Sequence, residues 1–349
     1  MVALASPKPI VLYPQAVTEA GPAAARDAFG RAMTYLRISL TDRCNFRCLY
    51  CMPAVGMTFQ PRDEHLTDDE LLRLVRLFAR LGVTKLRLTG GEPTVRPRLV
   101  ELVRAMKAVP GIDELSMTTN ALLLSRIAEP LKAAGLDRVN VSIDTLDPVK
   151  FKFMTRGGRL DLVWAGIEAA DAAGLRPIKL NSVVVRDQND HEVGDLAQLT
   201  VERPWQVRFL EIMPMEGVGD VHDQGMVTSE QTLARLEERF GPLDPVESDP
   251  ADPARLWRIP GAAGTIGFIS PVSAPFCAAC NRVRLTADGK LRLCLLRPDE
   301  ADLRDLLRSG ADDEALERRM RVAVWRKPWG HGLAEGERET VRGMSQIGG

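Results

Sequence analysis

Three cysteines lie within a short stretch near the start of the chain, at Cys44, Cys48 and Cys51. Thiolate sulfur selects iron–sulfur clusters, zinc or Cu(I), and thiolates this close in sequence can meet at one metal centre. A structural zinc site usually takes a fourth Cys or His nearby, and none lies at the usual spacing. The group therefore favours a four-iron cluster that keeps one iron open. Zinc ligands and free structural thiols are the alternatives.

A second group, Cys277, Cys280 and Cys294, contains the other cysteines of the chain. The first two alone are typical of a zinc ribbon. The segment before Cys294 predicts a β-hairpin around a turn at 287–289, which returns Cys294 to the first pair. The four histidines show no matching spacing, so a cluster is favoured over zinc, with a distant histidine as the open alternative.

Alternating β-branched runs and amphipathic helices follow from Tyr35 onward, and these elements must position the cysteines. One helix is marked by a capping box at Thr67 and Glu70 and ends near Gly82. The predicted strands are 35–40, 84–88, 114–118, 138–143, 177–185 and 206–212. The predicted helices are 67–82, 98–108, 125–134, 160–173 and 191–199, with two more at 303–309 and 313–325.

Six strand-then-helix units imply parallel strands with right-handed crossovers. We expect an α/β fold, a partial (β/α)6 TIM-type barrel of parallel strands, with a C-terminal extension closing the barrel mouth. A flat doubly wound sheet is the alternative. The expected parts are a poorly ordered extension at 1–30, the barrel at 31–241, a Pro- and Asp-rich linker at 242–264, and a C-terminal region at 265–349.

The composition is that of an ordinary globular chain of 349 residues, 45% hydrophobic and 27% charged. It contains no apolar run of 18 residues and no secretory signal, so we expect a cytoplasmic protein without a membrane span. The formal net charge of -1 gives no electrostatic basis for bulk nucleic-acid binding. Any anionic ligand must therefore be bound by locally placed Arg and Lys.

Such residues lie on three of the predicted strands, at Arg37, Arg87 and Lys179. A charged residue within an apolar strand either is solvated at an edge or faces the interior of a barrel. For each residue alone the two alternatives are about equally good. Together they favour an anion bound inside the barrel.

The first cysteine group, with Tyr50 ahead of its last cysteine, resembles the motif of the radical S-adenosylmethionine (SAM) superfamily. The segment 88–93, Leu-Thr-Gly-Gly-Glu-Pro, is similar to the glycine-rich SAM-binding segment of that superfamily, although a glycine pair after a strand also indicates a plain turn. The resemblance implies a [4Fe-4S] cluster at this group, with SAM at its open iron. The residues it places around SAM are Tyr50, Gly91, Ser142 and Met213; for the last two, a helix cap and core packing are the alternatives.

The second cysteine group, the segment 281–284 behind it and the terminal Gly348 and Gly349 resemble the GTP 3′,8-cyclase family of molybdenum cofactor biosynthesis. This resemblance covers the chain from Tyr35 to its end. It implies a second [4Fe-4S] cluster at Cys277, Cys280 and Cys294, which meets the guanine of GTP. The residues it assigns to GTP are Arg37, Arg87, Thr118, Lys179, Arg282, Val283 and Arg284.

The resemblance also implies a reaction, in which a 5′-deoxyadenosyl radical takes the hydrogen from ribose carbon 3′ of GTP and the sugar then bonds carbon 8 of guanine. Arg37 is a candidate to assist the final reduction to 3′,8-cyclo-7,8-dihydro-GTP. Gly348 and Gly349 are expected to reach into the site, because residues without side chains fit a narrow cleft. Simple fraying of the terminus is the alternative.

Two other functions are consistent with parts of the sequence. One is a twin-cluster radical SAM enzyme that modifies peptides, although such enzymes usually carry more C-terminal cysteines. The other is a zinc-binding interaction protein. The family further implies a homodimer, a reductant of flavodoxin or ferredoxin type, and transfer of the product to the cyclic pyranopterin monophosphate synthase.

Overall fold

The computed structural model is built on one curved sheet, and it describes residues 25–53, 55, 57–215, 219–333 and 342–348. The sheet has twelve strands in the order β12-β11-β10-β1-β2-β3-β4-β5-β6-β9-β8-β7. The strands are β1 (Tyr35–Ser39), β2 (Lys85–Thr89), β3 (Glu114–Thr119), β4 (Arg138–Ser142), β5 (Lys179–Val184), β6 (Gln206–Glu211), β7 (Asp244–Val246), β8 (Ala254–Arg258), β9 (Thr265–Ile269), β10 (Arg282–Leu285), β11 (Lys290–Arg292) and β12 (Glu300–Asp302).

The six predicted strands are β1 to β6, and they lie side by side in chain order and in parallel. The C-terminal half adds a parallel neighbour at each side, β10 beside β1 and β9 beside β6. Antiparallel strands then flank each side. The expected partial barrel is confirmed, but its parallel part is two strands wider than the sequence predicted.

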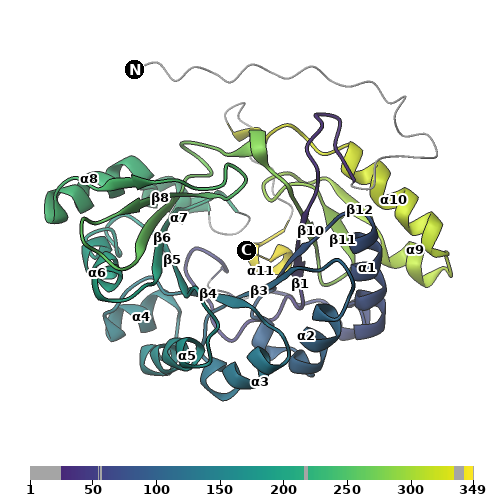
Figure 1. Ribbon diagram of the computed structural model, residues 1–349, viewed down its shortest axis with the longest axis horizontal. Coiled ribbons are helices and arrows are strands. Elements are labelled where there is room, and N and C mark those ends of the chain that lie inside the picture. The colour runs from purple at the N-terminus through teal and green to yellow at the C-terminus, as the bar shows by residue number, and fades with distance from the viewer. Residues whose placement is uncertain (1–24, 54, 56, 216–218, 334–341, 349) are drawn as a thin grey trace.

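Helices cover the outer side of this curve, as Figure 1 shows for α1 to α6. The helices are α1 (Asp68–Arg80), α2 (Leu99–Lys107), α3 (Ala128–Ala133), α4 (Pro148–Met154), α5 (Leu160–Ala172), α6 (Val193–Glu202), α7 (Gly219–Gly225), α8 (Ser229–Phe240), α9 (Arg304–Arg308), α10 (Asp313–Trp325) and α11 (Met344–Ile347). Short 3-10 turns lie at η2 (Arg62–Glu64), η3 (Pro93–Val95), η4 (Leu124–Arg126) and η5 (Cys277–Ala279). No helix in the described ranges is long and apolar enough to cross a membrane.

The alternation of residues along the strands separates a hydrophobic outer face from a polar inner face. Leu36 and Ile38 of β1 are fully buried beneath the helices, and Leu86 and Leu88 of β2 repeat the pattern. Side chains between them point to the other face, because successive strand residues alternate sides. Arg37 therefore points into the interior of the curve, as do Arg284 and Arg87, its partners in register on the neighbouring strands.

The predicted start of α1 is confirmed in detail. The Thr67 hydroxyl accepts from the Glu70 N–H at 3.2 Å, and the Glu70 carboxylate accepts from the Thr67 N–H at 2.8 Å. This reciprocal pair satisfies two backbone donors at the helix start. The buried face of α1 contains Leu71, Leu74 and Phe78, as the spacing predicts.

Residues 242–264, expected as a linker, instead contain β7 and β8, which extend the sheet from β9. These two strands were not predicted, because they are short and the stretch is rich in proline. Pro245 is tolerated because β7 is an edge strand, and the backbone groups along its outer edge need no hydrogen-bond partner from another strand. The division into domains at this stretch stays a prediction.

The expected N-terminal extension lies mostly in residues 1–24, outside the described residues. Residues 25–30 belong to the folded chain. The Ala25 N–H donates to the Leu81 carbonyl at 2.8 Å, and the carboxylate of Asp27, which is 1% exposed, pairs with Arg31 at 2.6 Å. Residues 25–30 therefore pack with the rest of the chain, and the domain boundary expected at residue 30 stays a prediction.

Candidate active site

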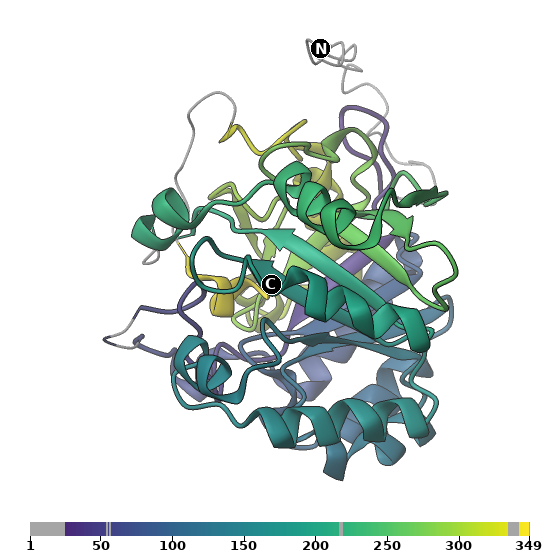
Figure 2. The ribbon, with the colours of Figure 1, turned by 90° about the vertical axis from the view of Figure 1, so that its left-hand side faces the viewer.

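A cavity of about 300 Å³ lies within the curve of the sheet, and both cysteine groups line it. Pockets of this size hold small-molecule ligands. Figures 1 and 2 place the short helix α11 inside the curve in both views, and its residues Met344 and Ser345 also line the cavity. The three segments that the sequence singled out, 44–51, 277–294 and the C-terminal tail, therefore meet at one site.

A row of arginines crosses the inner face of the sheet at one level. Strand register aligns Arg284 of β10 with Arg37 of β1, and Arg37 with Arg87 of β2. All three line the cavity, as do Arg282, also on β10, and Arg208 of β6. The row concentrates positive charge in a chain whose formal net charge is only -1.

This charge is held at an energetic cost in the protein alone. Burial, together with the nearby Arg284 and Arg87, lowers the pKa of Arg37 well below its ordinary value. The Nε atoms of Arg37 and Arg282 are buried and have no hydrogen-bond partner among the described residues. Buried donors without partners are rare, so these atoms indicate an anionic ligand that accepts from them.

The predicted GTP residues are not all equivalent. Thr118 lines the cavity, whereas Lys179 of β5 lies on the same inner face but outside the lining residues. Burial and the repulsion from Arg208 and Arg138 lower the pKa of Lys179 to about 6. Val283 packs in the hydrophobic core between its arginine neighbours, so only its backbone could meet a ligand.

The first cysteine group lies on the segment that follows β1. A turn positions the thiols of Cys48 and Cys51. In this turn the N–H groups of Cys51 and Met52 donate to the Cys48 carbonyl, each at 3.0 Å. The Asn120 side chain lies 3.9 Å from the Cys44 sulfur and donates to Asn45 at 2.6 Å. The three sulfurs are therefore presented to one part of the cavity by the ends of β1 and β3.

The thiols of this group are difficult to ionise in the protein alone. Burial raises the pKa of Cys44 to about 11 and that of Cys51 to about 12, and it raises the pKa of Cys48 well above its usual range. Neighbouring thiols and Asp144 add to the effect on Cys48 and Cys51. Metal ligation requires thiolates, so assembly of a cluster here releases protons.

The glycine pair after β2 lies against the backbone that leads into the first cysteine group. A Cβ atom on Gly91 would lie 2.3 Å from the Arg43 carbonyl oxygen, and one on Gly90 would lie 2.6 Å from that of Thr41. The Gly91 N–H donates to the Thr41 carbonyl at 2.6 Å. Glycine is required because a side chain would separate the two segments.

Glu92, next to that pair, ties two loops together. Its carboxylate accepts from Thr94 and from the hydroxyl of Thr119 at 2.6 Å, and from the Asn120 N–H at 2.7 Å. The side chain is 1% exposed and lines the cavity. Burial raises the pKa of Glu92 despite these donors.

The predicted SAM residues Tyr50, Gly91, Ser142 and Met213 all line the cavity. The Tyr50 hydroxyl donates to Asp144 at 2.7 Å, and the Val183 N–H donates to the same carboxylate at 2.9 Å. Burial raises the pKa of Asp144 to about 6, although both hydrogen bonds oppose this. Asp144 therefore fixes the Tyr50 ring beside the first cysteine group.

The second cysteine group is held by the hairpin predicted from the sequence. Strands β10 and β11 pair with Arg284 opposite Arg292, and η5 contains Cys277. The ammonium group of Lys327 donates to the carbonyls of Arg282 and Leu293 behind the thiols. Burial works against a charge on Cys280, but Lys327 and Arg282 outweigh it and lower its pKa to about 7.

The N-terminal region also supports the second group. The Arg31 guanidinium donates to the Cys277 carbonyl at 2.6 Å and to the Trp329 carbonyl at 2.9 Å. Arg31 is itself oriented by Asp27. No local sequence pattern predicts this contact, because Arg31 and Cys277 lie 246 positions apart.

The tail brings Gly348 to the arginine row, where its carbonyl oxygen accepts from Arg284. A Cβ atom on Gly348 would meet the Thr89 hydroxyl oxygen at 2.1 Å. Gly349 lies outside the described residues.

Four residues that line the cavity, or that contact its lining as Asp144 contacts Tyr50, were not predicted. Arg208 could have been found, because it alternates with apolar residues on a predicted strand as Arg37 does. Glu92 was part of a recognised segment, and Asp144 follows a strand end, where active-site residues of barrels gather. Lys327 had no local signal, because its partners lie on a hairpin far away in the chain.

The donor set fits iron–sulfur clusters. All six cysteines are free thiols, three at each part of the cavity. Within the described ranges, no three Cys, His, Asp or Glu side chains lie close enough together to hold a single metal ion. Thiolates of a cluster bind different irons and stand further apart than ligands of one zinc ion.

Two protein-family models and a set of curated proteins match this chain. Residues 38–200 match the model of the radical SAM superfamily, and residues 205–333 match the model described as Molybdenum Cofactor Synthesis C. The chain is 50% identical over 328 residues to the GTP 3′,8-cyclase of Heliobacterium modesticaldum, covering 93% of this chain and 99% of that protein. The enzyme of Moorella thermoacetica is 46% identical over 325 residues, covering 93% and 100%.

Solved structures show a similar fold. SuiB of Streptococcus suis bound to S-adenosylmethionine superposes with a TM-score of 0.59 at 13% identity, over 86% of this chain and 67% of that one. SuiB bound to its precursor peptide gives 0.56 at 15% identity, over 87% and 67%. At these identities the likeness establishes the fold alone.

Proposed function

Because this chain belongs to the GTP 3′,8-cyclase family of radical SAM enzymes, we propose that it converts GTP to 3′,8-cyclo-7,8-dihydro-GTP in molybdenum cofactor synthesis. The observation that carries this proposal is the single cavity lined by both cysteine groups and by the arginine row. Such a cavity can hold one nucleotide between two clusters.

In the proposal, Cys44, Cys48 and Cys51 hold one [4Fe-4S] cluster, and Cys277, Cys280 and Cys294 hold the other. When bound, the clusters would supply electrons and SAM would supply the radical that takes a hydrogen atom from ribose carbon 3′. Carbon 3′ would then bond carbon 8 of guanine, and a second electron with a proton would complete the reduction. The chain itself contributes position, charge and the exclusion of water. Tyr50, Gly91, Ser142 and Met213 surround SAM.

The arginine row binds the triphosphate of GTP. Guanidinium groups bond phosphate oxygens in pairs, and the buried donors of Arg37 and Arg282 gain the acceptors they lack. Binding also relieves the mutual repulsion of Arg37, Arg284 and Arg87. Thr118 and the more distant Lys179 complete this polar end of the site, and Gly348 lies against it at Arg284.

The test is anaerobic incubation of the reconstituted protein with dithionite, SAM and GTP. We expect equal amounts of 5′-deoxyadenosine and the cyclised nucleotide, and about eight irons per chain. Serine at the three C-terminal cysteines should halve the iron and abolish the cyclised nucleotide while some SAM cleavage persists. Serine at the three N-terminal cysteines should abolish both products.

Other outcomes would overturn the proposal. Cleavage of SAM without any nucleotide product, together with consumption of a peptide, would favour the peptide-modifying alternative. Zinc without sulfide in the reconstituted protein would favour an interaction protein.

The proposal extends to partners. A flavodoxin- or ferredoxin-type protein would reduce the first cluster, the product would pass to the cyclic pyranopterin monophosphate synthase, and the chain would act as a homodimer in the cytoplasm. Support for these points comes from the family alone.

A further inference from the structure

Asp288 lies at the turn between β10 and β11 and contacts two segments that are distant in the chain. Its carboxylate accepts from the Gln60 side chain at 3.3 Å and from the two terminal nitrogens of Arg342 at 2.9 and 3.2 Å. Asp288 is 4% exposed. Burial alone would raise the pKa of Asp288, but hydrogen bonds from Arg342, Thr286 and Gln60 hold it below the usual value.

The Arg342 contact anchors the start of the C-terminal tail. The guanidinium lies between Asp288 and Glu300, with its Nε 2.8 Å from the Glu300 carboxylate. Helix α11 follows at once, and then Gly348, whose carbonyl accepts from Arg284. The tail is therefore fixed at both ends, by an ion pair at Arg342 and by the arginine row at Gly348.

The Gln60 contact leads to the first cysteine group. The Gln60 N–H donates to Asp42 at 2.7 Å, and Asp42 lies two positions before Cys44. The ring of His65 lies 3.3 Å from the other oxygen of Asp42. A short series of contacts thus runs from the segment of the first cysteine group, through Gln60 and Asp288, to the tail.

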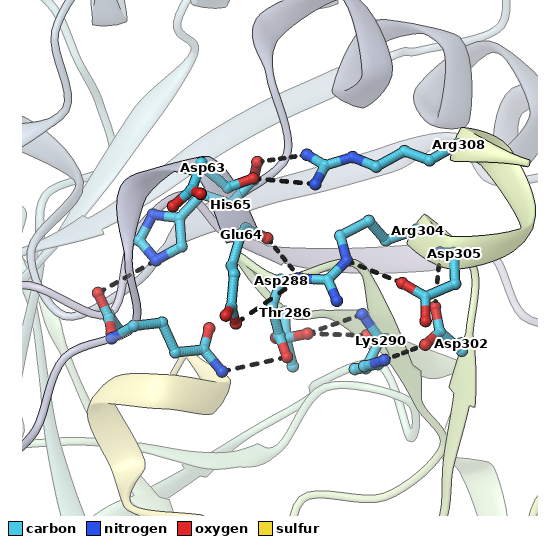
Figure 3. Close-up of polar contacts among 12 residues, drawn as sticks. Asp63, Glu64, His65, Thr286, Asp288, Lys290, Asp302, Arg304, Asp305 and Arg308 are labelled. Carbon is cyan, nitrogen blue, oxygen red and sulfur yellow. Dashed lines mark hydrogen bonds and ion pairs between the residues drawn. The ribbon is translucent and has the colours of Figure 1, made fainter.

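The loop that contains Gln60 has further support on the C-terminal region. Figure 3 shows Arg304 and Arg308 reaching from α9 to the segment of Asp63, Glu64 and His65. Arg304 donates to the Glu64 carbonyl at 2.8 Å, and Arg308 donates to the Asp63 carbonyl at 2.9 Å. The Leu66 N–H donates to the Ala287 carbonyl at 2.8 Å. These contacts hold Asp63 to Leu66 on α9 and the hairpin if the Asp288 carboxylate is removed, so the change is confined to the part of the loop around Gln60.

We propose that Asp288 is a positioning residue that couples the C-terminal tail, held at Arg342, to the loop behind the first cysteine group, held at Gln60. A buried carboxylate is costly unless it is paired and hydrogen-bonded. Within the described ranges, Arg342 is the cation in ion-pair contact with Asp288. The tail and the loop are therefore both stabilised by hydrogen bonds to the Asp288 carboxylate. If either segment moved away, this buried carboxylate would lose a donor. The consequence for catalysis rests on the proposed function.

Hydrogen exchange of the full-length chain tests the coupling without reference to activity. The variants are Asp288→Asn and Arg342→Gln, and the matched control is Asp190→Asn, which removes a buried carboxylate paired with Arg235 of α8 at 2.6 Å. In both test variants we expect amides of 343–348 to exchange about tenfold faster, the effect of losing a charged hydrogen bond. Amides of 57–62 should also exchange faster, even in Arg342→Gln, which does not touch that loop. The control should leave both segments unchanged.

Several outcomes would contradict the proposal. If Arg342→Gln frees the tail and leaves 57–62 unchanged, the two segments are not coupled. If the tail stays protected in both test variants, Asp288 does not hold it. In the double variant we expect no more exchange than in the worse single variant, and additive effects would show independent roles.

Turnover gives a second measurement. We expect the test variants to cleave SAM but to form about tenfold less cyclised nucleotide per 5′-deoxyadenosine, with partial recovery in Arg342→Lys. An unchanged ratio would overturn the catalytic consequence, even if the tail exchanges faster. If the unsubstituted protein forms no cyclised nucleotide, the proposed function fails, whereas the exchange result still decides the coupling.

Discussion

The carbonyl oxygen of Gly348 accepts a hydrogen bond from the guanidinium of Arg284. This bond places the end of the chain on the same row of arginines that the parallel strands align across the sheet. The backbone of Gly348 has a φ of +72° and packs against Thr89 and Ser39. The tail thus forms part of the cavity wall.

Alanine at Gly348 should displace the tail. The new Cβ would lie 2.1 Å from the Thr89 hydroxyl oxygen, in a backbone conformation that L residues rarely adopt. We expect the yield of cyclised nucleotide per 5′-deoxyadenosine to fall at least about tenfold. The measurement is single-turnover product analysis.

Gly310→Ala is the matched control, because Gly310 also has a positive φ, +87°, but has open space where its Cβ would lie. Adding Thr89→Ala to Gly348→Ala removes the clashing oxygen and should restore part of the yield. Equal losses in Gly348→Ala and Gly310→Ala would show that backbone strain, and not the position of the tail, causes the effect.

Replacing Arg37 with methionine should stabilise the protein and abolish its function. Arg37 is an enclosed cation that Arg284 and Arg87 repel, and its Nε has no partner among the described residues. Replacing an uncompensated charge by an apolar side chain of similar length should raise the free energy of unfolding by about 1 kcal/mol or more. GTP binding should weaken at least about tenfold.

Urea unfolding and GTP titration measure the two effects of Arg37→Met. Arg76→Met on the exposed face of α1 is the control and should change neither. Loss of stability in Arg37→Met would mean that Arg37 is already well compensated in the protein without ligand.

The sequence predicted the strands that carry local patterns. Arg37, Arg87 and Lys179 are charged residues on predicted strands, and their occurrence together favoured the barrel interior over a solvated edge. The capping box at Thr67 and Glu70 also rests on residues three apart. Signals of this kind lie within one element and can be found without tertiary structure.

The remaining features depend on contacts between distant residues. Arg31 and Lys327 both stabilise the segment of the second cysteine group by donating to backbone carbonyls. Every residue has such a carbonyl, so no residue type in the sequence marks these contacts. Strand β9 was not predicted although it is as long as β1, and its place beside β6 follows from tertiary packing. Asp288 appeared in the sequence only as part of a turn, and its contacts with Gln60 and Arg342 required the fold.

Glutamine at Glu92 should destabilise the loops around the first cysteine group. The carboxylate accepts from donors of Thr94, Thr119 and Asn120, and an amide nitrogen would face at least one of these donors. The expected loss is about 1–3 kcal/mol of unfolding free energy, measured in urea. Glu101→Gln on an exposed position of α2 should change stability by less than about 0.5 kcal/mol. An equal effect of both substitutions would refute the role of Glu92.

Lys179 should make GTP binding depend on pH. Burial, with Arg208 and Arg138 nearby, lowers the pKa of Lys179 to about 6, so the amine is mostly neutral above that pH. A triphosphate favours the charged form and raises the pKa of Lys179. Between pH 6 and the raised pKa, the complex then holds more protons than the free protein, so affinity falls as pH rises.

Calorimetry at pH 7.5 in buffers of different ionisation enthalpy counts the protons taken up on GTP binding. The unsubstituted protein should take up more protons than Lys179→Met, by up to about one. Lys132→Met, at an exposed position on α3, should match the unsubstituted protein. The free protein should show the opposite linkage, since a Lys with a lowered folded pKa destabilises the fold at neutral pH, and this effect diminishes as pH rises toward the unfolded pKa of about 10.4. Equal proton uptake in all three proteins would place Lys179 beyond the reach of the triphosphate.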